Sequence, residues 1–274
     1  MKRHSDFRYV VLAGERPGGN ALAREFHLPA SVLVSVGGES CLNRVLNALQ
    51  SSELVHSGVI CGPAREAVDQ SDELRKTLSD PDVRWLEPET GPAASTGTAI
   101  TILAHFPILI TTADHALLNA GIIDDFCNRA ADTDMDLVVG LVPYPLVRES
   151  FPHSRRTVLR FSDGHYCGSN LFAVLNENGA RAIQLWQQVE SERKKPWKIA
   201  RRLKFTMMLR YLTGRLSLAQ GLRVLSEKSG CRVGHVVVEH VRAAVDVDSK
   251  ADWALADRLL REDNATSRAE TAVP

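Results

Sequence analysis

The sequence predicts an α/β protein, a three-layer αβα sandwich in which helices cover both faces of a mostly parallel sheet. Two observations support this prediction. Short apolar segments rich in β-branched residues alternate with helical patterns through the first half of the chain, which favours parallel strands joined by right-handed crossovers. A buried-strand pattern that starts at residue 106 also runs into a carboxylate, Asp114, and ligands bind at the carboxyl ends of the strands in such sheets.

The elements of the first half follow from hydrophobic periodicity and from breaks at glycine and proline. We expect strands at residues 9–13, 55–61, 83–86, from 106 up to Asp114, and at 137–142. The segment 32–38 leads into a helix whose apolar face carries Leu42, Val45, Leu46 and Leu49. Further helices are expected over residues 64–78, after a loop at 91–96, and from about 119.

The second half is less regular. Segments 157–161 and 166–175 flank a turn at 162–165 and predict a β-hairpin. Later elements are a helix at 178–190, a strand at 233–241 and a helix at 250–261. We expect a single domain over residues 1–262, a basic helical insertion within it at about 191–230, and a disordered tail at 263–274.

Composition limits the class of protein. With 274 residues, 44% of them hydrophobic, the chain can bury a substantial core. Lys+Arg and Asp+Glu are both 33, so the net charge favours no partner, and we expect no binding to nucleic acid. The five cysteines occur singly, which fits a reducing compartment and offers no zinc site. No signal peptide or bilayer-length apolar stretch is recognised, so we expect a cytoplasmic protein.

Two features of the sequence point to phosphate and metal chemistry. A glycine-rich turn with Arg16 follows the first strand, where backbone amides and a fixed charge can meet a phosphate, although its spacing fits neither the Walker loop nor the dinucleotide fingerprint. Asp114, after a buried strand, can hold a hard cation through oxygen, and paired acids, Asp246 and Asp248, follow the last strand. The alternative for Asp114 is a turn or helix-cap role, which is common for aspartate at a strand end.

Five motifs follow in order along the chain: the glycine-rich turn at 12–19, the segment 36–39, the acid motif 112–115, the acceptor motif 168–172 and the closing motif 246–249 with Asp252. With these motifs in this order, the chain resembles the MobA-like nucleotidyltransferases, which have a GT-A-type, Rossmann-like fold, over residues 10–260. The resemblance implies a set of nucleotide-binding residues: Leu12, Ala13, Gly14, Glu15, Arg16, Gly18, Gly19 and Ser95. It implies that Asp114 and Asp246 bind Mg²⁺ and that Arg16 acts with them in catalysis. The acceptor-binding residues are expected to be Gly168, Ser169, Asn170, Lys194, Lys195 and Lys198.

The implied reaction is Mg²⁺-dependent transfer of an NMP from an NTP to a small phosphorylated acceptor, with release of pyrophosphate. Two alternatives stay open: a GT-A-type glycosyltransferase that uses a nucleotide sugar, and a degenerate member that binds nucleotide without turnover. The basic segment 193–210 is expected to contact the acceptor's phosphate, with an anionic membrane surface as second choice and a solvated helix face as the default. A homodimer is also kept open.

The chain departs from the family pattern at two positions. Ser31 stands where the family has a lysine that reaches the nucleotide's phosphates, and Glu15 replaces a glycine of the first turn. Either another cation takes over, with Arg16, Arg24, Arg155 and Arg156 as candidates, or the protein is a slow or non-catalytic member.

Overall fold

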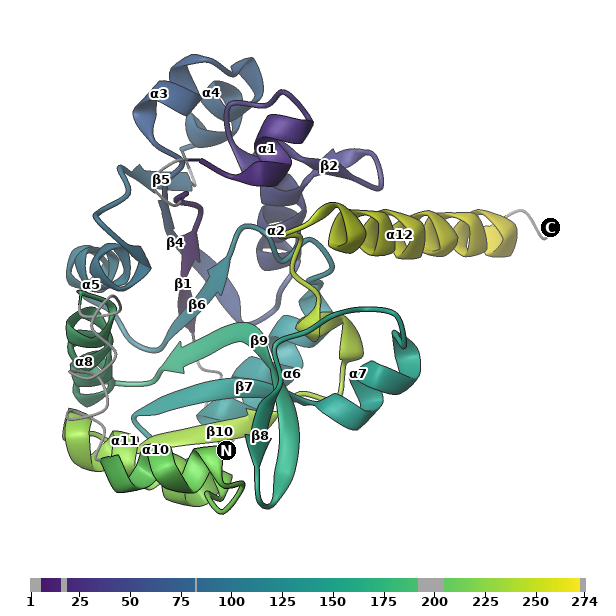
Figure 1. The fold of residues 1–274 in the computed structure, drawn as a ribbon. Helices are drawn as coiled ribbons and strands as arrows, with labels where there is room; N and C mark the ends of the chain where they lie inside the picture. Colours follow the sequence, from purple (N-terminus) through teal and green to yellow (C-terminus); the bar gives the residue numbers. More distant parts are fainter. Residues whose placement is uncertain (1–5, 16–18, 82, 192–204, 272–274) are drawn as a thin grey trace.

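The structure is a computed structural model that describes residues 6–15, 19–81, 83–191 and 205–271. These residues form an eight-stranded sheet between two layers of helices, which confirms the predicted αβα class (Figure 1). The strand order is β10-β7-β9-β6-β1-β4-β5, with β8 paired to β9. The strands are β1 (Phe7–Leu12), β4 (Val55–Cys61), β5 (Val83–Leu86), β6 (Ile108–Thr112), β7 (Leu137–Pro143), β8 (Leu159–Phe161), β9 (Gly164–Val174) and β10 (Val233–Val237).

One strand breaks the parallel pattern. β9 is inserted between β6 and β7 and is antiparallel to both. On one side of it β7 pairs with β10 in parallel, and on the other side β6, β1, β4 and β5 pair in parallel in that order. β8 and β9 form the predicted hairpin, with Phe161 opposite Gly164. The ladder between β7 and β9 shifts register between Val139 and Leu141, which marks a β-bulge in β9.

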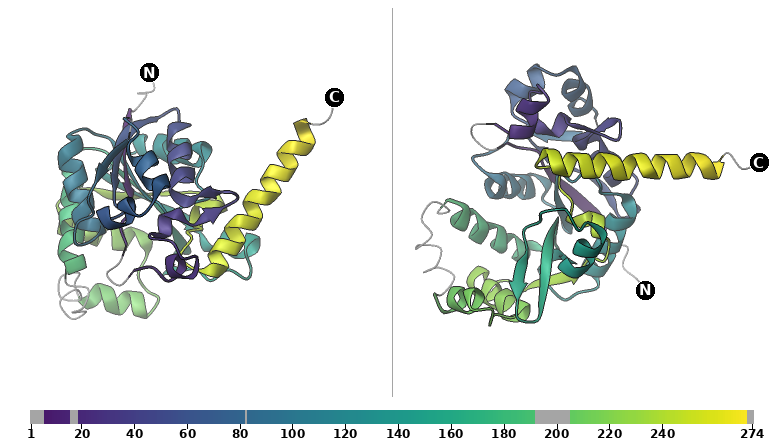
Figure 2. Two further views of the ribbon diagram at one scale, coloured as in Figure 1. Left: turned by 90° about the horizontal axis from the view of Figure 1, so that it is seen from above. Right: turned by 45° about the vertical axis from the view of Figure 1, so that its right-hand side comes forward.

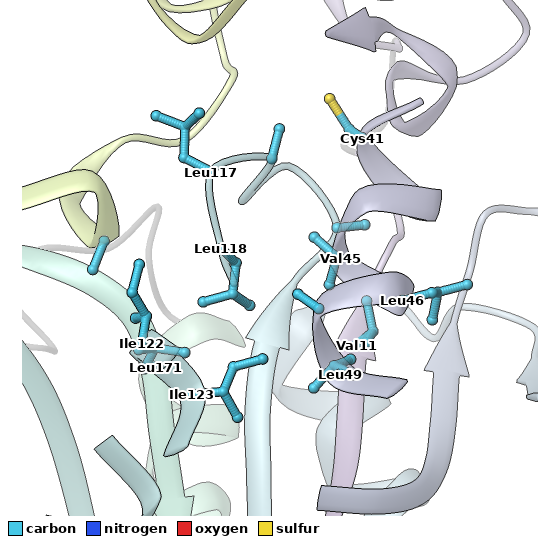
Figure 3. Packing of buried hydrophobic residues seen from close by; sticks show 14 of the residues in the cluster. Val11, Cys41, Val45, Leu46, Leu49, Leu117, Leu118, Ile122, Ile123 and Leu171 are labelled. Carbon is cyan, nitrogen blue, oxygen red and sulfur yellow. The ribbon is translucent and has the colours of Figure 1, made fainter. Parts of the chain in front are cut away.

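The helices form two layers because alternate residues of each strand point to opposite faces. Val11 of β1 packs into a cluster with residues of α2 (Cys41–Gln50) and α6 (Ala120–Ala131), shown in Figure 3. Its neighbour Val10 packs on the other face with residues of α5 (Pro92–Leu103), α8 (Ala180–Ser191) and α11 (Leu218–Ser229). The remaining helices are α1 (Ala21–Glu25), α3 (Arg65–Asp69), α4 (Asp72–Leu78), α7 (Tyr144–Ser150), α10 (Phe205–Leu212) and α12 (Lys250–Thr271).

Three predicted elements differ from the structure. The expected helix over 64–78 is two helices, α3 and α4, because Ser71 caps a new helix by accepting a hydrogen bond from Leu74 N. The loop prediction for 91–96 is wrong, since α5 already begins at Pro92, a residue that tolerates the first helical position. The last strand ends at Val237, and the chain then turns into a short 3₁₀ helix, Val241–Ala244.

The C-terminal helix α12 is longer than predicted and continues as helix to Thr271, so the residues from 263 onward that we expected in a disordered tail are helical up to that point. Its first turns pack on the small hairpin of β2 (Ser35–Val36) and β3 (Glu39–Ser40). Trp253 Nε1 donates to Ser35 O at 2.8 Å, and Asp257 Oδ1 accepts from Gly37 N at 2.7 Å. Arg242 Nη2 also donates to Asp263 Oδ1 at 2.8 Å, and beyond this contact the helix extends away from the rest of the molecule (Figure 2).

The expected basic insertion is described only in part. Residues 192–204 lie outside the described part of the chain, and α10 and α11 follow them. The division into one domain with an insertion therefore stays a prediction. None of the helices described has both the length and the apolar character needed to cross a bilayer.

Candidate active site

The ends of three neighbouring strands bring the predicted motifs to one edge of the sheet. Leu12, the last residue of β1, pairs with Cys61 of β4 and with Thr112 of β6. The contact continues beyond the strands, because Ala113 N donates to Leu12 O at 2.9 Å. The glycine-rich turn and the acid motif therefore begin side by side, as expected for a site at the carboxyl ends of parallel strands.

Close packing at this edge requires a glycine at position 62. Gly62 has a φ of +91°, and a Cβ on it would lie 2.7 Å from Gly14 N. Any other residue would therefore push the start of the first turn away from the sheet. This contact fixes where Gly14 leaves β1.

Asp114 lies just beyond β6 and is half-buried. Its carboxylate accepts a hydrogen bond from the Thr112 hydroxyl at 2.5 Å. Burial is the main cause that raises the pKa of Asp114 to about 6; the Thr112 hydrogen bond opposes this shift, and the negative charges of Asp248 and Asp246 add to it. The acids of the closing motif are thus close enough to Asp114 to repel it.

A backbone contact holds the two acid motifs together: Val247 N donates to Asp114 O at 3.0 Å. Val247 is buried, whereas Asp246 beside it keeps 33% of its side chain exposed. A buried anchor between two acids leaves their carboxylates at the surface of the site. Asp114 and Asp246, predicted from separate strands, are therefore brought together.

The structure adds a residue whose place in the site the sequence did not indicate. Arg156, with a side chain only 6% exposed, places Nη1 2.7 Å from Asp246 Oδ1 and Nη2 2.7 Å from Asp252 Oδ1. Its Nε also donates to Ser154 Oγ at 2.9 Å. The guanidinium thus bridges two acids of the closing motif. Sequence reasoning named Arg156 only as a substitute for the missing lysine, because the bridge depends on contacts between distant segments.

His115, next to Asp114, is a packing residue. It is 1% exposed, and its ring lies against the backbone of Arg242 and Ala243. Burial lowers its pKa to about 4, so the ring is neutral near pH 7. A neutral, enclosed imidazole does not supply charge to a phosphate.

The glycine-rich turn is described in part. Leu12, Ala13, Gly14 and Glu15 follow β1, while Arg16 and Gly18 lie outside the described residues, and Gly19 resumes the chain with a φ of +75°. Glu15 Oε1 accepts a hydrogen bond from the backbone N–H of Ser31 at 2.5 Å. The two positions at which the chain departs from the family are thus in direct contact.

Ser95, expected at the nucleotide, is buried in the first turn of α5. It is 4% exposed, and its hydroxyl accepts a hydrogen bond from Glu89 N at 2.9 Å, which ties down the loop before α5. The hydroxyl therefore already has a structural use, and contact with a nucleotide stays a prediction.

The expected acceptor motif lies on β9 at its bulge. Ser169 is buried and donates its hydroxyl to Gly140 O at 2.9 Å, and Asn170 has a φ of +51°. β6 and β9 pair as far as Ile110 and Phe172, so the segment before Phe172 runs at the level of the end of β6, where Asp114 follows. Gly168 is exposed there. Lys194, Lys195 and Lys198 lie outside the described residues.

The donor set at this edge fits Mg²⁺. In the part of the chain that the structure describes, no group of three or more His, Cys, Asp or Glu side chains is arranged to hold a metal ion. Mg²⁺ is commonly held by one or two carboxylates together with substrate phosphates, which matches the pair Asp114 and Asp246. A cation would also counter both the burial and the smaller repulsion from Asp248 and Asp246 that raise the pKa of Asp114.

Comparison with known proteins identifies the family of the chain. The family model of the MobA-like NTP transferase domain matches residues 30–228. The chain belongs to this family. It is therefore a nucleotidyltransferase, as the sequence predicted. The family match leaves out the first turn and Asp246, so these parts of the MobA-like site rest on the geometry above. No curated protein matches the chain.

Solved structures show the same fold. A hypothetical transferase from Thermus thermophilus is 26% identical, with a TM-score of 0.75, over 90% of this chain and 99% of that one. The 2-C-methyl-D-erythritol 4-phosphate cytidylyltransferase of Thermus thermophilus is 12% identical, with a TM-score of 0.53, over 94% and 99%. A CMP:2-keto-3-deoxy-manno-octonic acid synthetase in complex with CTP is 9% identical, with a TM-score of 0.57, over 94% and 99%. At such identities the last two show only that the MobA-like chain shares their fold.

Proposed function

We propose that this MobA-like protein transfers an NMP from an NTP to a small phosphorylated acceptor, with release of pyrophosphate, and that the reaction depends on Mg²⁺. The observation that carries the proposal is the meeting of Asp114 with Asp246 and Asp248, held by the hydrogen bond from Val247 N to Asp114 O. Two carboxylates at the end of a parallel sheet, beside a glycine-rich turn, are suited to a metal-bound triphosphate.

In this proposal the residues position groups and offset charge, and no side chain acts as a nucleophile. A lone pair on an acceptor oxygen forms the new bond to the α-phosphorus, the bond from that phosphorus to the bridging oxygen breaks, and pyrophosphate leaves with those electrons. Amides of the turn around Gly14 bind the phosphates, and Asp114 and Asp246 hold Mg²⁺. When bound, Mg²⁺ supplies positive charge against the developing charge of the phosphates.

The names of two similar structures support the same reaction class, because they describe a cytidylyltransferase acting with a 4-phosphate and a synthetase bound to CTP. CTP is therefore the first nucleotide to test. The cytoplasmic location, a homodimer and a contact of segment 193–210 with the acceptor's phosphate or an anionic membrane remain predictions.

The test is pyrophosphate release from each of the four NTPs, with and without Mg²⁺, across a panel of phosphorylated acceptors. Release that requires Mg²⁺, one NTP and an acceptor supports the proposal. Transfer from a nucleotide sugar without pyrophosphate release would instead indicate a glycosyltransferase. Tight Mg²⁺-dependent NTP binding with no turnover on any acceptor would indicate a non-catalytic member.

A further inference from the structure

A cavity of about 580 Å³ lies between the loop that follows α7 and the first three turns of α12. Ligand sites for small molecules are typically clefts of this size with apolar walls and a few well-placed polar groups. Phe151, Ala254 and Leu255 supply apolar wall here. The described residues of the glycine-rich turn, Gly14, Glu15 and Gly19, contribute nothing to its lining.

The polar part of the lining is mainly basic. Arg155 from the loop and Arg258 from α12 line the cavity, and His153 lies with them. Within the described residues Arg155 has no ion pair, and Arg258 has a single distant one, Nε to Glu262 Oε1 at 4.0 Å. Both guanidinium groups therefore have donors to offer to an anion.

Among the described residues that line the cavity, Asp252 is the one acid, and its negative charge is offset by Arg156, which does not line the cavity. Asp252 Oδ1 lies 2.7 Å from Arg156 Nη2, and Asp252 Oδ2 accepts from the Ser249 hydroxyl at 2.5 Å. The carboxylate thus already has a cationic partner and a hydroxyl donor. The balance of charge that an incoming ligand meets comes from Arg155 and Arg258.

The same ion pair connects the cavity to the candidate active site. Arg156 contacts Asp252 with one nitrogen and Asp246 with another, so a single guanidinium group separates the cavity wall from a proposed metal ligand. In-line attack on an α-phosphorus requires the acceptor's oxygen to come within about 3–3.5 Å of that phosphorus. An acceptor placed at the acids is therefore within reach of this cavity.

We infer that the cavity binds the acceptor, with its apolar walls around the acceptor's body and Arg155 and Arg258 on a phosphate at the end away from the attacking oxygen. The inference rests on the proposed nucleotidyl transfer and adds to it the class of acceptor, a phosphate monoester with an apolar body. It assigns recognition of the acceptor's phosphate to two described arginines, as an alternative to the contact expected for the basic segment 193–210.

Phenyl phosphate, which joins an apolar ring to a phosphate, is the probe. Calorimetric titration of the full chain should show that it binds more tightly than inorganic phosphate, since only the ester fills the apolar part of the cavity. The double variant R155A/R258A should lose about tenfold or more in affinity, because two charge-assisted contacts are removed. Arg148→Ala, an exposed arginine of the neighbouring helix α7 that does not line the cavity, is the matched control and should bind as the wild type does.

A second variant tests the site without touching charge. Ala254→Trp fills the apolar wall and should weaken phenyl phosphate more than it weakens inorganic phosphate. Equal affinity of phenyl phosphate for the wild type and for R155A/R258A, or no binding to the wild type, would overturn the inference. NTP binding, followed by thermal shift on the same samples, separates the two proposals. A wild type that fails to bind any NTP but binds phenyl phosphate through these arginines would contradict nucleotidyl transfer and leave the anion site standing.

Discussion

The backbone N–H of Val247 donates a hydrogen bond to the carbonyl oxygen of Asp114 across 3.0 Å. Because Val247 stands between Asp246 and Asp248, this one bond fixes the closing acids against the end of β6. Main-chain atoms therefore hold Asp114 against the segment Asp246–Asp248, and this bond remains when one acid side chain is replaced. This makes the acids suitable for substitution.

The first prediction concerns those acids. Asp114→Ala and Asp246→Ala should each lower Mg²⁺-dependent turnover by about 10²-fold or more, since each removes a preorganised electrostatic contact, while the fold stays intact. Pyrophosphate release and circular dichroism measure the two effects. The control is Asp125→Asn, which should keep full activity. Asp125 is a partly exposed residue of α6 that pairs with Arg129. Unchanged turnover in both alanine variants would refute the two-acid site.

The second prediction concerns pH in a metal-free sample. The folded pKa of Asp114, about 6, lies above its ordinary value of 3.8, so between these values the folded state binds more protons than the unfolded state. The free energy of unfolding should therefore be highest below about pH 4, as far as Asp114 contributes to it, and should fall by about 2–3 kcal/mol as the pH rises through 6. Asp114→Asn should remove this dependence and be the more stable protein at pH 7 in EDTA. Urea denaturation at pH 4.5 and pH 7 tests it, and parallel pH curves for both proteins would disprove it.

The third prediction concerns Arg156. Replacing it with methionine leaves Asp246 and Asp252 without their shared cation and should cost about 3 kcal/mol of folding stability. Arg156→Lys should lower the folding stability by less, because lysine keeps the positive charge but cannot contact both acids with two nitrogens. The neighbouring Arg155→Met, an exposed change, should stay within about 0.5 kcal/mol of the wild type in the same urea titration. Equal losses at both positions would show that the bridge contributes no specific stability.

The fourth prediction concerns the two departures from the family. Arg156 is occupied by two acids, so it is not the substitute for the missing lysine. Of the remaining candidates, Arg16, Arg24 and Arg155, we test Arg16 first because it belongs to the glycine-rich turn. Ser31→Lys should leave turnover within about tenfold, while Arg16→Ala should lower it by about 10²–10³-fold. The Ser31→Lys variant keeps the backbone N–H at position 31, which donates a hydrogen bond to Glu15, so this local contact is retained. A large gain in Ser31→Lys would instead show that the native site is impaired.

Much of the fold could be predicted from local patterns. β4 and β5 occupy the residues expected from their β-branched, apolar sequences, and α6 begins after Asn119, whose side chain accepts from Ile122 N. The place of Asp114 could also be predicted, because it follows the general rule about the carboxyl ends of strands, whereas Asp246 lies beyond the 3₁₀ helix Val241–Ala244 and reaches the site through the loop after it. Their role in metal binding remains a prediction.

The rest depends on contacts between distant segments. Nothing in the sequence of β9 indicates that it enters between two earlier strands, since its pattern fits a hairpin strand equally well. The bridge made by Arg156 joins residues 90 positions apart, and the bond between Glu15 and Ser31 depends on how two loops meet. Such contacts are set by tertiary packing, which periodicity does not report.

The insertion of β9 also bears on how the chain assembles during synthesis. β6 and β7 emerge from the ribosome one after the other but are not neighbours in the sheet, because β9 occupies the place between them. Until residue 174 has emerged, β6 offers an open edge that no later strand has yet paired. A nascent chain stalled after β7 would expose this edge next to apolar side chains such as Leu109 and Ile110. The middle of the sheet can therefore close only after β9 has been synthesised, and because β9 is antiparallel to β6, its earlier residues lie at the end of β6 that carries Asp114.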